Sequence, residues 1–267
     1  MTTRSTPEVV YARVLAAGLI ADFGITSPEE IDVEALAMAQ GIFVRDGRMN
    51  GAEAWLVRRG NKGIIRVRDD IPEVGRRRFA IGHELGHWHQ HKGISQWAYC
   101  EEGDIGRYGG SVLEVEANAF ASELLMPGVF FRPKCERATP DLGLIGRLAE
   151  TFRTSLTATA MRFLDETSEN CILVVSKDRV VEWFKRIDGR TRLWIEPRTA
   201  LDHRSAAWDL SCESRPFEAM KRVPPAAWFK NAGEGTEVYE QSIRLGRYGS
   251  VLSLLWIIGE DEREREA

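Results

Sequence analysis

The chain has 267 residues, of which 43% are hydrophobic, and a formal net charge of −4 at neutral pH. This composition is sufficient for an ordinary globular core, and the negative charge weighs against direct nucleic-acid binding. The sequence has no apolar run of about 18 residues and no apolar core of a signal peptide near its start, so we expect a cytoplasmic protein without a membrane partner.

The first predicted elements are two helices. Residues 7–23 fit a helix that begins near Pro7 and ends before Gly24. A second helix is predicted over 33–40, with Asp32 as its N-cap and Gly41 after its end. The apolar residues that indicate this first helix are Val10, Val14, Leu15, Leu19 and Ile20.

Residues 52–67 predict a β-hairpin. Two apolar runs flank the segment RRGNKG, and its glycine and asparagine residues suit a tight turn.

The next predicted helix contains the sequence His83-Glu84-Leu85-Gly86-His87, an H-E-x-x-H motif. Residues four apart lie about one helical turn from each other, so His83 and His87 project from the same face. Two such imidazoles can bind one Zn²⁺ ion, and Glu84 can hold the water that the metal activates. The alternative is a buried helix with two hydrogen-bonded histidines.

Charged residues on both sides of the motif allow two interpretations. Arg76, Arg77 and Arg78 could form a nucleic-acid patch, but a solvated face or ion pairs with acidic groups are favoured. His91 lies four residues after His87, so it could support a metal ligand or contact substrate. The other interpretation of His91 is a helix-end residue that interacts with the C-terminal dipole.

A catalytic zinc site needs a third protein ligand, and the predicted helix over 111–127 offers two acids, Glu114 and Glu116. Asn118 stands one turn beyond Glu114, where a polar side chain can support a metal-bound histidine. This favours Glu114, which follows His83 by 31 residues (114 − 83). Alternatively, Ser111 and Glu114 form a capping box, in which Glu114 only bonds the backbone of Ser111.

The rest of the chain predicts two short helices and then strands. Residues 141–166 resemble a helix-turn-helix, but the start of its second helix is rich in Ser, Thr and Ala, so packing on the core is favoured over DNA binding. Two hairpin patterns follow after residue 168. The four cysteines lie at least 35 residues apart, so we expect free thiols and no cysteine zinc site.

The predicted fold class is α+β. A mostly helical, zincin-like peptidase domain with a small β-hairpin or sheet is expected over 1–167. A strand-rich C-terminal domain is expected over 168–267, with a role in sensing, substrate presentation or dimerisation.

The segments RRRFAIGHELGH and E-x-E-A-N-x-F-A-x-E-L-L-M-P resemble the ImmA/IrrE metallopeptidase family. The similarity covers roughly residues 8–165. It implies that His83, His87 and Glu114 bind zinc and that Glu84 is the catalytic base. Better-understood members cleave a helix-turn-helix repressor and so derepress genes for stress response or mobile-element transfer. Many relatives carry a DNA-binding domain ahead of the peptidase, and only about seven residues precede the first helix here, so the target is expected to be a separate chain.

The expected function is zinc-dependent endopeptidase action on a specific regulatory protein, such as a helix-turn-helix repressor or an antitoxin. One alternative is a regulatory partner that binds such a protein without cleaving it, and another is a DNA-binding regulator. The candidates for stabilising the oxyanion are Tyr99, Tyr108, His91 and His203. In zinc peptidases a strand near the metal often pairs with extended substrate, so one hairpin strand, around Trp55 or Ile65, could do so here; an ordinary covering hairpin is the alternative.

Overall fold

The computed structural model describes residues 8–49, 51–91, 111–136, 138–210, 219–246 and 249–259. The fold is α+β, as predicted, and the chain forms two compact units. Unit 1 comprises Met1–Pro133 and Leu148–Ala158, and unit 2 comprises Lys134–Arg147 and Thr159–Ala267. Among the described residues, no helix combines the length and the apolar character needed to cross a membrane.

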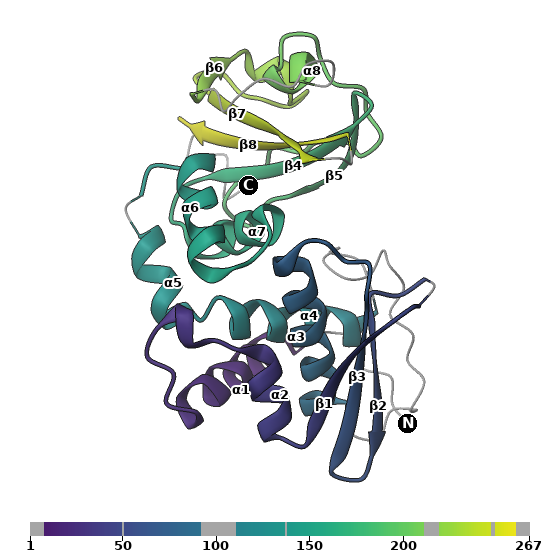
Figure 1. The fold of residues 1–267 in the computed structure, drawn as a ribbon. Helices are drawn as coiled ribbons and strands as arrows, with labels where there is room; N and C mark the ends of the chain where they lie inside the picture. The colour runs from purple at the N-terminus through teal and green to yellow at the C-terminus, as the bar shows by residue number, and fades with distance from the viewer. Residues whose placement is uncertain are drawn as a thin grey trace. The chain divides into compact units, whose positions relative to one another are not determined.

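Unit 1 contains a helical layer and a three-stranded sheet (Figure 1). Its helices are α1 (Val9–Asp22), α2 (Val33–Ala39), α3 (Val74–Gln90) and α4 (Val112–Leu125), with a 3-10 turn at Pro28–Glu30. Its strands are β1 (Ile42–Gly47), β2 (Ala54–Arg59) and β3 (Lys62–Arg68), in the order β1-β3-β2.

The predicted first helix is confirmed, but not all of its apolar residues face the core. Val10 and Val14 are 77% and 62% exposed. The side chains that α1 buries are Ala12, Ala16, Leu19 and Ile20. Small alanines let α1 lie close against α4, and the β-branched residues therefore turn to solvent. The α2 prediction is confirmed in detail, since the Asp32 carboxylate accepts hydrogen bonds from two backbone N–H groups of the first turn.

The predicted hairpin is the antiparallel pair β2–β3, and a strand that was not predicted, β1, pairs in parallel with β3. β3 is therefore the middle strand, and its backbone is occupied on both edges. The prediction that the strand around Ile65 pairs with substrate is wrong for this reason, because strand addition needs an open edge. Trp55 lies on β2, which among the described strands pairs only with β3.

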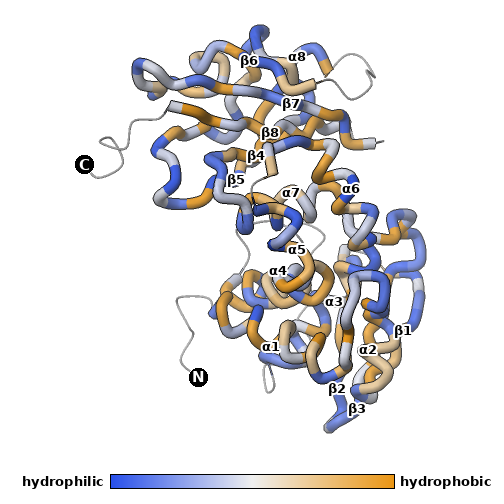
Figure 2. Tube along the Cα trace, turned by 90° about the vertical axis from the view of Figure 1, so that its left-hand side faces the viewer, coloured by the Kyte–Doolittle hydropathy of each residue, from blue (hydrophilic) through white to orange (hydrophobic). Residues whose placement is uncertain are grey.

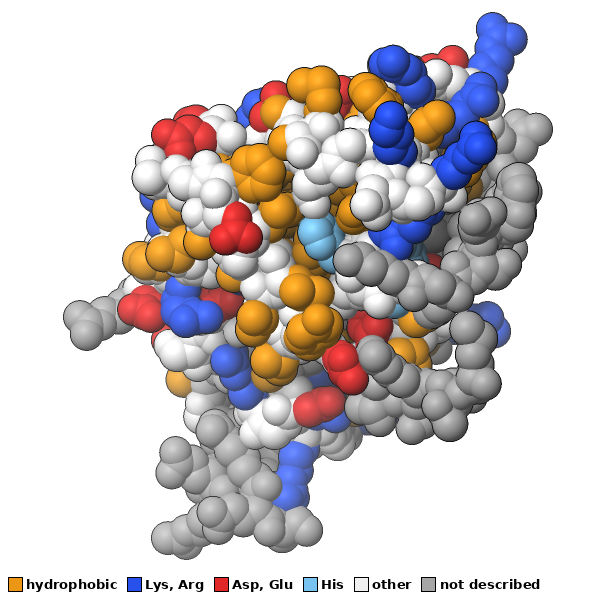
Figure 3. Space-filling view, turned by 90° about the horizontal axis from the view of Figure 1, so that it is seen from below, with side chains coloured by type: hydrophobic (Ala, Val, Ile, Leu, Met, Phe, Trp, Pro, Cys, Tyr) orange, Lys and Arg blue, Asp and Glu red, His pale blue; other side chains and the backbone are white. Residues whose placement is uncertain are grey.

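The two faces of this sheet differ strongly. Gly63, Ile65 and Val67 of β3 are buried on the face toward α3. The opposite face carries the exposed side chains Phe43, Arg45, Arg59, Lys62, Ile64 and Arg66. Figure 3 shows Lys and Arg side chains gathered at the upper right of the view, with hydrophobic side chains among them. The alternation along β3 follows the two-residue period of a half-buried strand.

Close packing joins α3 to α4. A Cβ added at Gly86 would lie 2.9 Å from the Cα of Ala117, so only glycine allows this approach of the two backbones. At Gly82 the nearest atom would be the Cβ of Ala121 at 3.4 Å, which is an ordinary contact. Gly86 therefore sets the distance between the two helices directly before His87 and about one turn after His83.

The arginine triplet at the start of α3 has structural contacts. Arg76 pairs with Glu53, and Arg77 pairs with Glu34 and Asp46, which confirms the favoured ion-pair interpretation for these two. Arg78 is buried and donates hydrogen bonds to backbone carbonyls at 2.6–2.9 Å, those of Ile31, Phe152 and Arg153.

The helices that follow α4 are α5 (Gly128–Cys135), α6 (Leu142–Phe152) and α7 (Leu156–Glu166). The predicted helix pair corresponds to α6 and α7, and α5 was not predicted. Arg153 has a positive φ of 54° at the turn between the pair, and the Ser155 hydroxyl caps the N–H of Ala158. The turn and the adjoining helix ends belong to unit 1, while the outer parts of both helices belong to unit 2.

Unit 2 is built on a five-stranded antiparallel sheet with the order β5-β4-β8-β7-β6. Its strands are β4 (Cys171–Lys177), β5 (Val180–Lys185), β6 (Lys221–Val223), β7 (Glu237–Leu245) and β8 (Ser250–Ile258), and a short helix, α8, spans Ala206–Leu210. Both predicted hairpins, β4–β5 and β7–β8, are confirmed. In Figure 2 hydrophobic residues recur along these strands, whereas the turn between β2 and β3 of unit 1 is hydrophilic.

The compact units interleave along the chain, because 134–147 and 159–166 group with the C-terminal sheet. This grouping follows packing contacts, and a sequence domain need not share its limits. The division into a peptidase domain over 1–167 and a C-terminal domain over 168–267 therefore stays a prediction.

Candidate metal centre

Three side chains from two helices of unit 1 converge on one point. The ring atom His83 Nε2 lies 3.0 Å from His87 Nε2 and 3.0 Å from Glu114 Oε2. His87 Nε2 lies 3.3 Å from Glu114 Oε1. Among the described residues these three form a group whose ligand atoms all lie within 4.8 Å of one another, and all three are buried. The predicted set is brought together by the crossing of α3 and α4.

The helical repeat explains how the motif contributes. His83 and His87 stand one turn apart on α3, and their rings meet edge to face with centroids 4.7 Å apart. Glu84 follows His83 directly and is 2% exposed, so its carboxylate lies in the same buried layer of the helix.

Glu114 is the acid that reaches the histidines, as predicted in preference to Glu116. Ser111 is the N-cap residue of α4, but its side chain makes no capping hydrogen bond, so the reciprocal bonds of a capping box do not form. Glu116 is fully buried and faces elsewhere, with Oε2 2.9 Å from His91 Nε2 and Oε1 accepting the backbone N–H of Glu8 at 2.8 Å.

Each histidine also has a partner on its second nitrogen. His83 Nδ1 lies 2.9 Å from the side-chain oxygen of Asn118, and His87 Nδ1 lies 2.7 Å from His91 Nδ1. Such partners fix ring orientation at metal sites. The link from His91 to Glu116 was not predicted, because it depends on where α4 crosses α3.

The electrostatics of the cluster favour an ionised Glu114. Burial alone would raise the pKa of this carboxyl, but hydrogen bonds with His83 and His87 outweigh burial and hold it well below its usual range. Burial opposes protonation of His83, yet the contact with Glu114 and the charge of Glu84 raise its pKa. For His87, burial and the neighbouring histidines prevail, and its pKa is lowered. Glu114 is thus ionised beside two imidazoles, and its negative charge favours the binding of a cation.

This donor set fits zinc. Two imidazole nitrogens and one carboxylate oxygen are common zinc ligands, and three protein ligands leave a position for water. Bonds of about 2.0–2.1 Å in a tetrahedron separate neighbouring ligand atoms by about 3.3 Å. His83 Nε2 lies 3.0 Å from His87 Nε2 and 3.0 Å from Glu114 Oε2, and His87 Nε2 lies 3.3 Å from the other carboxylate oxygen, Glu114 Oε1. Each of these pairs of atoms is close to the spacing of neighbouring zinc ligands.

Three other predicted site residues were candidates for stabilising the oxyanion. Tyr99 and Tyr108 lie outside the described residues. His203 belongs to unit 2, where its side chain is 78% exposed and lies 3.5 Å from Asp202. The residue that stabilises the oxyanion therefore stays a prediction.

The edge strand β2 is fastened to the motif helix. The guanidinium of Arg58 lies 3.7 Å from the ring centroid of Trp88 and donates a hydrogen bond to the Trp88 carbonyl. Trp88 is the neighbour of His87, so this contact ties the strand to the helix next to a candidate ligand. An added Cβ at Gly63 would lie 2.9 Å from the Trp88 ring, which explains the glycine in β3.

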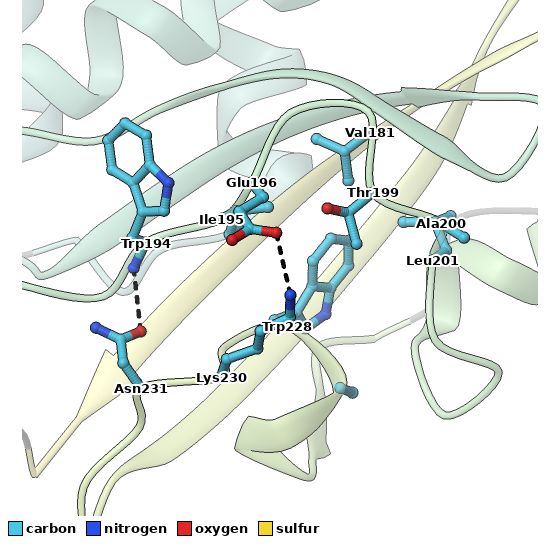
Figure 4. Close-up of a pocket in the computed structure, with 11 residues that line it drawn as sticks. Val181, Trp194, Ile195, Glu196, Thr199, Ala200, Leu201, Trp228, Lys230 and Asn231 are labelled. Carbon is cyan, nitrogen blue, oxygen red and sulfur yellow. Dashed lines mark hydrogen bonds and ion pairs between the residues drawn. The ribbon is translucent and has the colours of Figure 1, made fainter.

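Unit 2 carries a separate hollow, drawn in Figure 4. Trp194, Ile195 and Trp228 line it, and the ion pair of Lys230 with Glu196 at 3.0 Å stands at its side. The lining is mostly apolar, and its two charged residues satisfy each other.

A helix with H-E-x-x-H and a glutamate from the following helix form the ligand pattern of zinc metallopeptidases of the zincin type. Residues 37–164 match the Peptidase M78 family, described as the IrrE N-terminal-like domain. This segment of the chain is therefore similar to the ImmA/IrrE family, whose members are zinc metallopeptidases.

The remaining comparisons concern sequence relatives and fold. No curated protein matches the sequence. A solved structure described as a Mycobacterium tuberculosis transcriptional regulator is similar, with a TM-score of 0.59 and 16% sequence identity. The alignment covers 92% of this chain and 88% of that one. At this identity the likeness shows the fold, including both units, and no more.

Proposed function

We propose that this protein is a zinc-dependent endopeptidase that cleaves a specific regulatory protein. The observation that carries the proposal is the convergence of His83, His87 and Glu114, with Glu84 buried beside them on the same helix. A site that only binds metal and no longer catalyses a reaction would not need Glu84.

The reaction is hydrolysis of a peptide bond. Bound zinc would supply Lewis acidity, which lowers the pKa of its water to about 7 and polarises the scissile carbonyl. His83, His87 and Glu114 hold the ion. The Glu84 carboxylate accepts a proton from the attacking water and then delivers it to the leaving amine nitrogen.

The substrate segment is extended in this proposal and adds to the outer edge of β2. The edge is next to the motif helix because Arg58 stacks on Trp88. Backbone hydrogen bonds to an edge strand align a peptide without regard to its sequence, so side-chain pockets and distant contacts must supply the specificity.

The substrate class is a helix-turn-helix repressor or an antitoxin. Support comes from the family, in which known targets of this kind are cleaved. The similar structure is named as a transcriptional regulator, which is consistent with regulatory work by proteins of this fold. Direct binding of nucleic acid or membrane is not part of the proposal.

Cleavage of a neighbouring gene's product tests the proposal. Wild-type protein and the Glu84→Gln variant, both loaded with Zn²⁺, are incubated with a helix-turn-helix protein encoded beside this gene, and intact masses are measured. The expected result is two fragments with the wild type and an uncut target with the variant or with a chelator.

Three outcomes would count against this proposal. If the variant cuts as fast as the wild type, Glu84 is not the base. If the wild type binds the target tightly and leaves it intact, the protein is a non-cleaving regulatory partner. Retention of DNA in a salt-dependent filter-binding measurement would favour a DNA-binding regulator instead.

A further inference from the structure

His91 and Glu116 form a buried pair that the proposed mechanism does not use. Their side chains are 6% and 0% exposed, and His91 Nε2 lies 2.9 Å from Glu116 Oε2. A buried carboxylate is costly unless hydrogen-bond donors surround it. Because the pair stands directly behind His87, it is a candidate for a role at the metal centre.

The contacts form one continuous chain. His87 Nδ1 meets His91 Nδ1 at 2.7 Å, His91 Nε2 meets one oxygen of Glu116, and the other oxygen of Glu116 accepts the backbone N–H of Glu8. Glu8 is the N-cap residue of α1. The Glu116 carboxylate on α4 is thus held by the C-cap residue of α3 and by the N-cap residue of α1.

The direction of the hydrogen bonds follows from the far end of this chain. An ionised carboxylate only accepts, so His91 Nε2 must carry the proton that points to Glu116. In a neutral ring, His91 Nδ1 is then an acceptor. His87 Nδ1 must therefore donate, which leaves the lone pair of His87 on Nε2, the atom that faces His83 and Glu114.

His83 is held in the same tautomer by a single hydrogen-bond partner. Its Nδ1 lies 2.9 Å from the side-chain oxygen of Asn118, a carbonyl that accepts, so the lone pair of His83 also falls on Nε2. The two ligands are thus oriented by unlike partners: an amide for His83 and a histidine–glutamate pair for His87.

We propose that His91 and Glu116 are positioning residues that hold His87 in the orientation and tautomer that bind the metal ion. The inference rests on the proposed zinc site and adds to it a second layer that spans α3, α4 and the start of α1. Neither nitrogen of His91 is left to bind the ion itself, because one meets His87 and the other meets Glu116.

The affinity for zinc tests this inference without any substrate. His91→Phe keeps a ring of similar size but offers no acceptor to His87, and it should weaken zinc binding about 10- to 100-fold. The dissociation constant is measured by competition with a chromophoric chelator. The absorption bands of the Co²⁺-loaded protein, which report ligand geometry, should shift as well.

His89→Phe is the matched control. His89 lies on the same last turn of α3, but its ring stacks on Phe120 with centroids 5.2 Å apart, so phenylalanine preserves that contact. We expect this variant to bind zinc within about twofold of wild type, well below the 10-fold minimum expected for loss of an outer partner. Thermal unfolding of both metal-free variants checks that they are equally folded.

Rescue separates positioning from packing. His91→Gln restores a side-chain carbonyl that can accept from His87 Nδ1, and it should recover most of the affinity that His91→Phe loses. Glu116→Ala should weaken zinc binding to the same degree as His91→Phe.

The inference is overturned if His91→Phe binds zinc as tightly as wild type, or if His91→Gln and His91→Phe lose the same amount. A wild-type protein that binds no zinc would instead remove the proposed function. The two failures are therefore distinguishable in one set of titrations.

Discussion

Glu114 in unit 1 and Glu240 in unit 2 are both buried glutamates, and their surroundings differ. Glu114 faces the ring nitrogens of His83 and His87, and its pKa is lowered. Glu240 accepts four hydrogen bonds from neutral donors: the backbone N–H groups of Ala206 and Ala207, the indole of Trp228 and the hydroxyl of Ser242. Its pKa is raised, because burial outweighs those hydrogen bonds.

The difference shows how a buried acid in a candidate site, such as Glu114, can be distinguished from a structural one, such as Glu240. Glu240 joins the start of α8 to β7 and to Trp228, with each oxygen used twice. Glu114 meets groups that can bind a proton or a metal ion, and its geometry matches a shared ion. Burial alone does not distinguish the two, but the chemistry of the partners does.

The largest expected effect concerns a third buried acid, Glu84. Glu84→Gln should lower the rate of cleavage by about 10²–10⁴-fold, since general-base catalysis contributes this much. Bound zinc, measured by mass spectrometry of the metal content, should be unchanged. Loss of zinc from this variant would move Glu84 from the catalytic class into the ligand class.

The second prediction separates Glu114 from Glu116. Glu114→Ala removes a ligand and should weaken zinc binding by more than the 10- to 100-fold expected for an outer partner. Glu116→Ala should stay within that range, so the purified variant should still carry most of its zinc. The reverse order of the two affinities would exchange the roles of the two acids.

The third prediction tests whether the Glu114 contact depends on helix spacing. Gly86→Ala places a Cβ 2.9 Å from the backbone of α4 and should destabilise the protein by about 1–3 kcal/mol, with weaker zinc binding. Gly82→Ala meets only the Cβ of Ala121 at 3.4 Å and should be close to neutral or stabilising. Thermal unfolding with and without Zn²⁺ compares them, and equal behaviour of the two variants would show that the spacing is not restrictive.

The fourth prediction concerns the structural acid. Glu240→Gln replaces one accepting oxygen by an amide that donates, so two donors lose their partner, at a cost of about 1–3 kcal/mol. The loss in the free energy of unfolding is measured by denaturant unfolding of the full chain, followed by a signal that arises from unit 2. Little or no change would mean that the four contacts contribute little to stability.

The stability of the wild type and that of Glu240→Gln should depend differently on pH, because the pKa of Glu240 is raised. The folded state binds the proton more tightly than the unfolded state, whose Glu pKa is about 4.3. Stability contributed by Glu240 therefore rises as pH falls through the raised pKa toward that value. The free energy of unfolding of wild type minus that of Glu240→Gln should increase on acidification, and a decrease would contradict the direction of the shift. A lowered pKa, as at Glu114, gives the reverse sign.

Local sequence patterns were sufficient to predict the centre of the site. Four-residue spacing places His83 and His87 on one helix face, and Asn118 one turn beyond Glu114 pointed to the acid that the structure brings next to them. The hairpin β2–β3 and the strand pairs of unit 2 also follow from alternating apolar runs with turn residues between them.

Features that depend on tertiary packing were missed. The parallel partner β1 makes β3 a central strand, and nothing within β3 indicates this. Val10 and Val14 are apolar but exposed, since α1 buries its alanines instead. The contact of His91 with Glu116 joins residues 25 positions apart on two helices, so it needs the crossing of α3 and α4.

The candidate ligands on α3 and α4 link the stability of the protein to the supply of zinc. An ion held by His83, His87 and Glu114 links two helices that otherwise rely on the close approach at Gly86. A ligand that binds only the folded state stabilises it by about 2.7 kcal/mol at a free concentration one hundred times its dissociation constant. If this group binds zinc as proposed, the abundance of the folded protein should follow the supply of zinc, so that metal starvation removes both the proposed activity and the protein that carries it.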